Sequence, residues 1–152
     1  SRRDELCSLA DKIVFTGRID KYFDYRAGRL EYRSLRFDTK VIDTPNFQGN
    51  AVVNYTSADV PYTRIIEHKH FEYGTQPKTV ITYEYPATWS EGLEPYYPVN
   101  NERNNAIAAE YRQMARSMGN VIFGGRLGQY AYFDMDDTVA EALKLAEKEM
   151  GN

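Results

Sequence analysis

Three runs with the alternation of β-strands follow one another with short turns between them: NAVVNYT (50–56), YTRIIEHKHF (62–71) and TVITYEY (79–85). A longer strand-like stretch at 30–42 precedes them. Its apolar residues change face near Arg33-Ser34, which predicts a bulge or bend there. Because short connections favour antiparallel neighbours, the centre of the chain is predicted to be an antiparallel sheet.

The segments before and after this sheet in the sequence have the pattern of strands and helices from an α/β layer. Apolar residues recur at helical spacing after Asn100 or Asn101, either of which can cap the helix, and again near the C-terminus. The predicted fold class is therefore α+β. The predicted segments are a helix end at 1–11, a strand at 12–16, a turn at 20–28, a loop at 86–98, a helix ending at Met118, a strand at 120–123 and a helix at 136–150 with an apolar stripe of Val139, Ala142, Leu143 and Ala146.

The composition excludes several classes of protein. The 152 residues carry a net charge of −3, with 42% hydrophobic and 27% charged residues, which argues against disorder and against nucleic acid as a partner. The single cysteine, Cys7, cannot form an internal disulfide, so a cytoplasmic location is expected. Apolar runs of the ~18–20 residues that a membrane span needs are absent, so no membrane partner is expected.

Two arginines lie within tyrosine-rich strands and are candidate ligand contacts. Arg33 follows Tyr32, and Arg64 lies two residues after Tyr62. An arginine fork can bind a phosphate while neighbouring rings cover a flat ligand. An ion pair with a strand glutamate such as Glu84 explains the same pattern equally well, so both interpretations stay open at this point.

Two loops carry residues that suit a ligand. In EPYYP (94–98), two prolines hold two tyrosines on a stiff loop, which suits either a binding surface or a lid of tyrosines over the core. The glycine-rich segment GGRLG (124–128) precedes a helix whose N-terminus offers free N–H groups to an anion.

His68 and His70 are predicted to lie on one face of a strand. An H-x-H pair can bind zinc, but the sequence has only these two histidines, and its one cysteine is far away. We therefore expect no metal site, and we expect Cys7 to have a packing role rather than a catalytic one.

Together these strings resemble the UDP-galactopyranose mutase family. They occur in the family's order and at about its spacing along nearly the whole chain, and the last one is the most specific. The matching segments are VFTG (14–17), IDKYF (19–23), YRSL (32–35), Asn54-Tyr55, YTRIIE (62–67), EYP (84–86), PYYP (95–98) and GRLGQYAYFDMD (125–136).

The resemblance implies an isomerase with FAD as its cofactor. Members of the family interconvert UDP-galactopyranose and UDP-galactofuranose, with N5 of the reduced flavin as the nucleophile on the anomeric carbon. The family's G-x-G-x-x-G motif for FAD has no match here, since residues 1–30 contain only Gly17 and Gly28. The chain therefore resembles the C-terminal part of a mutase, and this part alone is expected to be inactive and not to retain FAD.

The resemblance also implies how the chain is divided. Residues 1–18 would belong to a Rossmann-like FAD domain, residues 19–100 would form a substrate-side antiparallel sheet domain, and residues 101–152 would return to the FAD domain as helix, strand and helix. The expected partners are UDP-galactose, the missing N-terminal half of the enzyme and further copies in a homo-oligomer.

The family's functional residues carry over by motif. Arg64 resembles the arginine that holds the substrate diphosphate, Tyr97 and Tyr132 resemble tyrosines that bond the same group, and Asn54 resembles a substrate-contacting asparagine. Arg33 and Glu84 resemble residues that line or brace the sugar pocket. No side chain is expected to be a nucleophile, because the flavin supplies one. The residues expected to bind the cofactor are Thr16, Gly17, Gly125, Arg126, Phe133, Asp134, Met135 and Asp136.

Two other functions compete with this one. The chain could be a stand-alone, tyrosine-rich binding module for a nucleotide-sugar or carbohydrate without catalysis, or a structural fragment that binds nothing. The segment GRLGQYAYFDMD favours the mutase, because a lectin-like module has no need of a strand, glycine loop and helix whose N-terminus faces an anion.

Overall fold

The computed structural model describes residue 5 and residues 7–151, and these residues form two compact units. The first unit joins residues 1–32 to residues 97–152, and the second is the intervening segment 33–96. Of the helix end expected at 1–11, Glu5 and Cys7 are helical, while residues 1–4 and 6 lie outside the described residues. The chain mixes helices with an antiparallel sheet, which confirms the α+β class.

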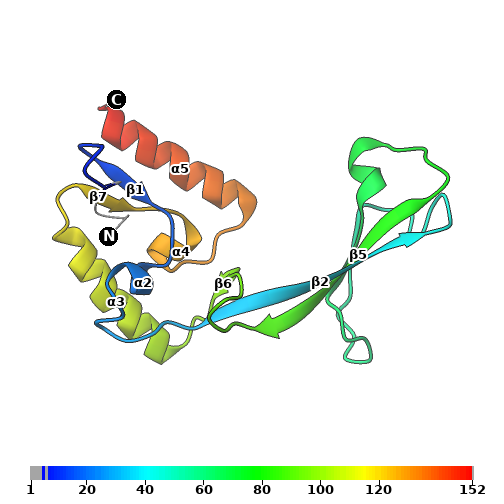
Figure 1. Ribbon diagram of the computed structural model, residues 1–152, viewed down its shortest axis with the longest axis horizontal. Coiled ribbons are helices and arrows are strands. Elements are labelled where there is room, and N and C mark those ends of the chain that lie inside the picture. Colours follow the sequence, from blue (N-terminus) through cyan, green and yellow to red (C-terminus); the bar gives the residue numbers. More distant parts are fainter. Residues whose placement is uncertain (1–4, 6, 152) are drawn as a thin grey trace. The chain divides into compact units, whose positions relative to one another are not determined.

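The first unit contains a parallel pair of strands from opposite ends of the chain. Ile13 of β1 lies opposite Val121 of β7, and Phe15 lies opposite Phe123, which confirms both predicted strands (Figure 1). The elements of this unit are β1 (Ile13–Phe15), α2 (Ile19–Tyr22), β6 (Tyr97–Pro98), α3 (Glu102–Arg116), β7 (Val121–Phe123), α4 (Gly125–Gln129) and α5 (Met135–Met150).

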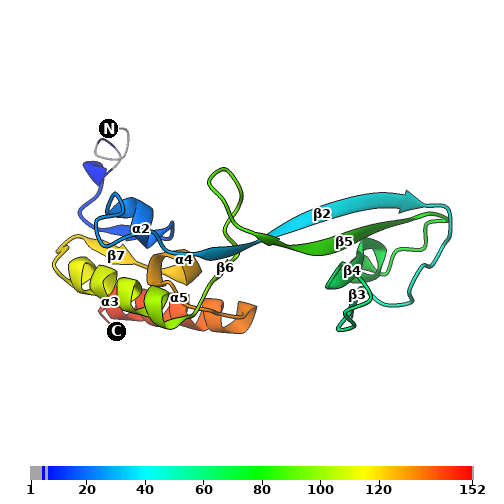
Figure 2. The same ribbon diagram turned by 90° about the horizontal axis from the view of Figure 1, so that it is seen from below.

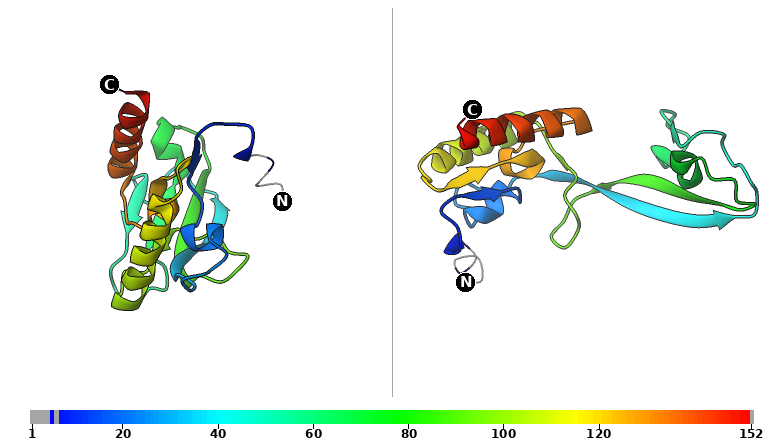
Figure 3. Two further views of the ribbon diagram at one scale, coloured as in Figure 1. Left: turned by 90° about the vertical axis from the view of Figure 1, so that its left-hand side faces the viewer. Right: turned by 90° about the horizontal axis from the view of Figure 1, so that it is seen from above.

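Helices cover both sides of this strand pair. Helices α3 and α5 lie on one side and α2 lies on the other (Figures 2 and 3). As predicted, α3 is capped by Asn101, whose side-chain oxygen accepts from the Asn104 N–H at 2.8 Å. Its Tyr111 is fully buried and stacks on Phe23, which ties α3 to the segment that follows α2.

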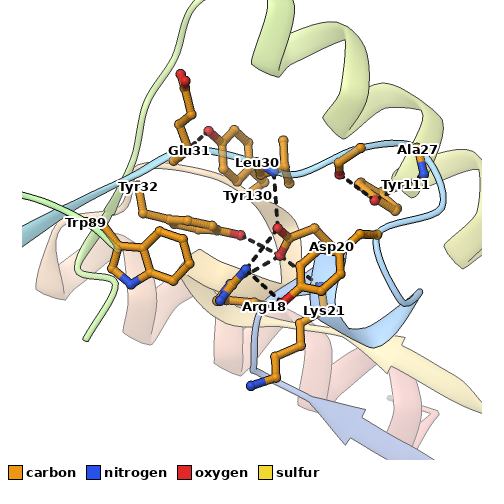
Figure 4. A network of polar contacts seen from close by, with 12 residues as sticks. Arg18, Asp20, Lys21, Ala27, Leu30, Glu31, Tyr32, Trp89, Tyr111 and Tyr130 are labelled. Atoms are coloured by element: carbon orange, nitrogen blue, oxygen red, sulfur yellow. Dashed lines mark hydrogen bonds and ion pairs between the residues drawn. The ribbon is translucent and has the colours of Figure 1, made fainter. Parts of the chain in front are cut away.

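A buried ion pair fixes the loop between β1 and β2. Asp20 is fully buried. Its carboxylate accepts hydrogen bonds from NH2 of Arg18 at 3.1 Å and from the Tyr32 hydroxyl at 3.2 Å (Figure 4). The Leu30 N–H donates to the same carboxylate at 3.1 Å. Because every oxygen of this buried charge is bonded, residues 18–32 are held in one conformation.

The second unit is built on a twisted antiparallel sheet, with strands in the order β3-β4-β5-β2 (Figure 2). Strands β2 and β5 pair from Arg33 opposite Thr88 to Ile42 opposite Thr79 without an inserted residue. Its elements are β2 (Tyr32–Ile42), whose first residue belongs to the first unit, β3 (Val52–Asn54), β4 (Arg64–Glu67), the 3-10 helix η1 (His68–Glu72) and β5 (Thr79–Thr88).

Of the bulge or bend predicted near Arg33-Ser34, the bulge is wrong, because the pairing of β2 with β5 has no inserted residue there. The change of phase has another cause, since Leu30 and Tyr32 are buried in the first unit, whereas Leu35 and Phe37 belong to the second. The two pairs of residues therefore need not share a face of one continuous strand.

The prediction that a loop begins at Pro86 is wrong by three residues, because β5 continues to Thr88. Proline lacks the N–H that a ladder needs. Glu84 is the last residue of β5 opposite β4, so Pro86 lies past the end of that pairing and its missing N–H removes no bond to β4.

The prediction that His68 and His70 share a strand face is also wrong, because both lie in η1. The chain leaves the sheet after Glu67, a fully buried carboxylate that accepts the N–H groups of Phe47 at 3.0 Å and Gln48 at 2.9 Å. Burial alone would raise the pKa of Glu67, but these two N–H groups, together with the neighbouring Thr79 and His70 side chains, outweigh it and lower the pKa to about 2. Nε2 of His70 lies 3.1 Å from the same carboxylate.

The glycine-rich segment after β7 is a short helix, α4, rather than a loop. A Cβ on Gly128 would lie 2.8 Å from the carbonyl oxygen of Phe15, so this glycine allows α4 to approach the backbone of β1. The close approach is therefore to the protein's own strand.

Helix α5 has the predicted period but presents its apolar stripe to solvent. Met135 is 82% exposed, Val139 59% and Leu143 60%, while Leu145 lies on the half-buried side. None of the described helices is both long and apolar enough to cross a membrane.

Candidate functional site

Four side chains form a row across one face of the sheet in the second unit. The register places Phe37 opposite Glu84, Glu84 opposite Arg64, and Arg64 opposite Asn54. Side chains alternate between the two faces of a strand, so all four lie on the face opposite to the buried Ile65. This row brings together three of the residues expected to bind substrate.

Contacts on two sides hold the guanidinium of Arg64 in this row. Its Nε donates to Oδ1 of Asn54 at 2.9 Å, and its NH1 donates to Oε2 of Glu84 at 3.4 Å. The Thr63 hydroxyl donates to the other oxygen of Glu84 at 3.3 Å. Among the described residues, NH2 of Arg64 has no partner, and the side chain is 38% exposed. A positioned arginine with one open nitrogen is suited to bind a phosphate oxygen.

The ion pair that the sequence left open is therefore present at Arg64. This ion pair occupies only one of the two terminal nitrogens of the Arg64 guanidinium, so the other can still bind a ligand. Arg33 lies on the same face of β2, four residues before Phe37, and is exposed. Its guanidinium has no partner among the residues that the structure describes.

A hydroxyl pair occupies the next row of the same face. The hydroxyls of Thr39 and Thr82 lie 2.8 Å apart, and Nε2 of His68 lies 2.8 Å from the Thr82 hydroxyl. The candidate residues quoted from sequence did not include Phe37, Thr39 or Thr82. The period of two in β2 and β5 could have placed them beside Arg33 and Glu84 once the register was known.

A second cluster lies in the first unit and joins four more of the expected residues. The rings of Tyr97 and Tyr132 stack with centroids 5.6 Å apart, and the Arg126 guanidinium lies 5.4 Å from the Tyr97 centroid. The Tyr132 hydroxyl donates to Oδ1 of Asp134 at 3.2 Å. The negative charge of Asp134 raises the pKa of Tyr132, so this phenol stays a neutral donor at neutral pH.

Asp134 also starts α5. It forms a capping box with Asp137, whose carboxylate accepts the Asp134 N–H at 3.3 Å. Asp136 and Asp137 place two carboxylates in the first turn, which lowers the positive potential there. An anion at this helix start would therefore depend on direct bonds to the N–H groups of Met135 and Asp136.

The remaining expected cofactor contacts lie at the ends of β1 and β7 and at the start of α5. Thr16 and Gly17 follow β1, and Gly125 begins α4 with a φ of 70°. A Cβ on Gly125 would meet the Thr16 side chain at 3.8 Å, so these two segments lie side by side. Phe133 is half-buried, whereas Met135 is 82% exposed.

Known proteins match nearly all of this chain. A family model described as UDP-galactopyranose mutase matches residues 1–132. A probable UDP-galactopyranose mutase of Klebsiella pneumoniae is 43% identical over 90% of this chain, and a UDP-galactopyranose mutase of Mycoplasma pneumoniae is 37% identical over 92%. A dTDP-fucopyranose mutase of Escherichia coli is 38% identical over 89%.

The matched part of each relative is short. The chain covers 35% of the Klebsiella protein and 36% of each of the other two, so it spans about a third of their length. The family model nevertheless matches most of the chain, and it includes the sheet row and every member of the second cluster except Asp134. The chain belongs to the UDP-galactopyranose mutase family.

Proposed function

We propose that this chain is part of a flavin-dependent isomerase that interconverts UDP-galactopyranose and UDP-galactofuranose. The observation that carries the proposal is the guanidinium of Arg64, which Asn54 and Glu84 hold in place while NH2 stays open. A diphosphate needs such an anchor, because the sugar must leave it and return without the nucleotide diffusing away.

Arg64 therefore binds the diphosphate, and Asn54 positions that arginine and contacts the substrate. The hydroxyls of Tyr97 and Tyr132 donate further bonds to the diphosphate, since hydroxyl donors suit phosphate oxygens. Arg33 and Glu84 line or brace the sugar pocket, and Glu84 does so through its bonds to Thr63 and Arg64.

The residues expected to face the flavin fit such a group in part. The helix start at Met135 and Asp136 offers backbone N–H groups, and a side chain on Gly125 would fill the space next to Thr16. Arg126 would add a positive charge beside an anionic ring, and Gly17, Phe133 and Asp134 would complete the contact. When bound, reduced flavin supplies the nucleophilic nitrogen for exchange at the anomeric carbon. The strands β1 and β7 would belong to a Rossmann-like FAD domain in the whole enzyme.

The test uses the complete protein that contains this chain. We expect reduced enzyme to interconvert the two forms of UDP-galactose, with dTDP-fucopyranose assayed beside it because one relative bears that name. Arg64→Ala should lower kcat/KM by at least ~10–150-fold, since a charge-assisted phosphate bond is worth about 1.5–3 kcal/mol. Arg64→Lys should restore activity only in part, because a point charge replaces a fork.

Arg36→Ala is the matched control. Arg36 is an exposed arginine of the same strand pair, but it lies on the other sheet face with its guanidinium 3.8 Å from the Tyr85 centroid. Its loss should leave turnover unchanged. Unaltered turnover and UDP affinity in Arg64→Ala would refute the assignment of the diphosphate site. Tight binding of a nucleotide-sugar by reduced wild type without isomerisation would favour the binding module instead.

A further inference from the structure

Phe37 is an apolar side chain at the end of a polar row, and neither packing nor the proposed diphosphate contacts explain it. It lies directly opposite Glu84, yet 45% of it is exposed. Its one ring contact among the described residues is with Tyr96. The two ring centroids lie 6.0 Å apart and the ring planes cross at 77°, an edge-to-face contact that restrains the Phe37 ring. A restrained, half-exposed aromatic ring beside polar groups is suited to bind a ligand.

The charges in the row decide which part of a ligand can reach this ring. The open nitrogen of Arg64 attracts a diphosphate toward the side of Asn54, whereas the carboxylate of Glu84 repels it from the side of Phe37. Phe37 is on β2 and Arg64 on β4, two strand spacings or about 9–10 Å apart. An anionic ligand group such as the diphosphate is therefore disfavoured at Phe37.

The polar groups around Phe37 suit a sugar better than a base. Glu84 accepts hydrogen bonds, and the exposed hydroxyl of Thr39, which lies 2.8 Å from that of the buried Thr82, can still donate or accept. A hexose offers hydroxyl groups that match both, together with C–H groups that can pack on a phenyl ring. A uracil base has a single N–H donor, flanked by two carbonyl oxygens that the carboxylate would repel, so it offers Glu84 fewer hydrogen bonds than a hexose does.

We propose that Phe37 packs against the apolar face of the hexose and is a specificity-determining residue of the site. This inference rests on the proposed function, because it takes Arg64 as the diphosphate anchor. The bare nucleoside diphosphate lacks the sugar, so its binding should not depend on Phe37.

The experiment compares sugar-nucleotide and nucleotide binding in the complete enzyme. For Phe37→Ala we expect KM for UDP-galactose to rise about three- to tenfold, with Kd for UDP within twofold of wild type. Phe37→Tyr keeps the ring, so its KM for UDP-galactose should stay close to that of wild type. Val41→Ala is the control, because Val41 is 70% exposed on the same face of β2 but lies outside the row.

Each other result contradicts the inference. An equal loss of UDP affinity would place the ring at the nucleotide, and unchanged KM with a lower Tm would show that Phe37 contacts polypeptide. Wild-type enzyme that neither turns over UDP-galactose nor binds UDP would overturn the proposed function itself. Wild-type turnover with no effect of Phe37→Ala would overturn this inference alone.

Discussion

Replacing Glu67 by glutamine should remove an acid-sensitive part of the stability of the second unit. The carboxylate is fully buried, and the two backbone N–H groups that it accepts, with smaller contributions from the Thr79 and His70 side chains, lower its pKa from 4.5 to about 2. That difference corresponds to up to about 3 kcal/mol of unfolding free energy at neutral pH. Because the folded pKa lies below the unfolded one, this stabilisation is complete above about pH 5 and is lost as the pH falls toward about 2.

Urea unfolding of this chain between pH 7 and pH 2.5 measures the effect. Emission of the single tryptophan, Trp89, reports on the second unit. We expect the unfolding free energy of wild type to fall by about 2–3 kcal/mol across this range, and Glu67→Gln to begin lower by a similar amount with a flatter profile. Asp43→Asn, at a carboxylate whose side chain is 82% exposed, should change the profile little. Parallel profiles for wild type and Glu67→Gln would refute this reasoning.

Three further predictions concern the first unit. The purified chain should be colourless and should not isomerise UDP-galactose, because it lacks the dinucleotide motif; flavin absorbance near ~450 nm that survives gel filtration would contradict this. Gly128→Ala should lower the free energy of urea unfolding by about 1–3 kcal/mol, since its Cβ would meet the Phe15 carbonyl at 2.8 Å, whereas Gly119→Ala, with open space around it, should be neutral. The chain should associate with itself through the exposed stripe of α5, and light scattering at rising concentration should show less association for Leu143→Lys; a wild type that stays monomeric would rule this out.

Local patterns predicted several elements well. Helix α3 could be placed because a helical apolar period follows a capping asparagine, and Asn101, one of the two candidate caps, is the residue that caps it. The strands β1 and β7 could be identified because each is a short apolar run that a glycine follows. Their parallel pairing depends on chain ends far apart in sequence, which no local pattern specifies.

Other features depend on neighbours that a single sequence does not reveal. The alternation of 62–71 continues through the histidines, but the chain turns into η1, where the buried amine of Lys69 donates to the carbonyl of Pro45 at 2.8 Å. A helical period likewise shows that α5 has an apolar side but not whether anything covers it. In the site, motif resemblance suggested Arg64 and Glu84, whereas the place of Phe37 in their row needed the register.

The hydrogen bond from the Tyr96 N–H to the Arg33 carbonyl, at 2.9 Å, joins the first and last residues of the second unit. A segment whose two ends meet can be cut out of its parent and closed with a very short linker, or opened elsewhere by circular permutation. Residues 33–96 are thus a transplantable cassette that carries the whole sheet row. Exchanging this cassette between relatives with different sugar nucleotides would separate the contribution of the sheet to specificity from that of the rest of the enzyme.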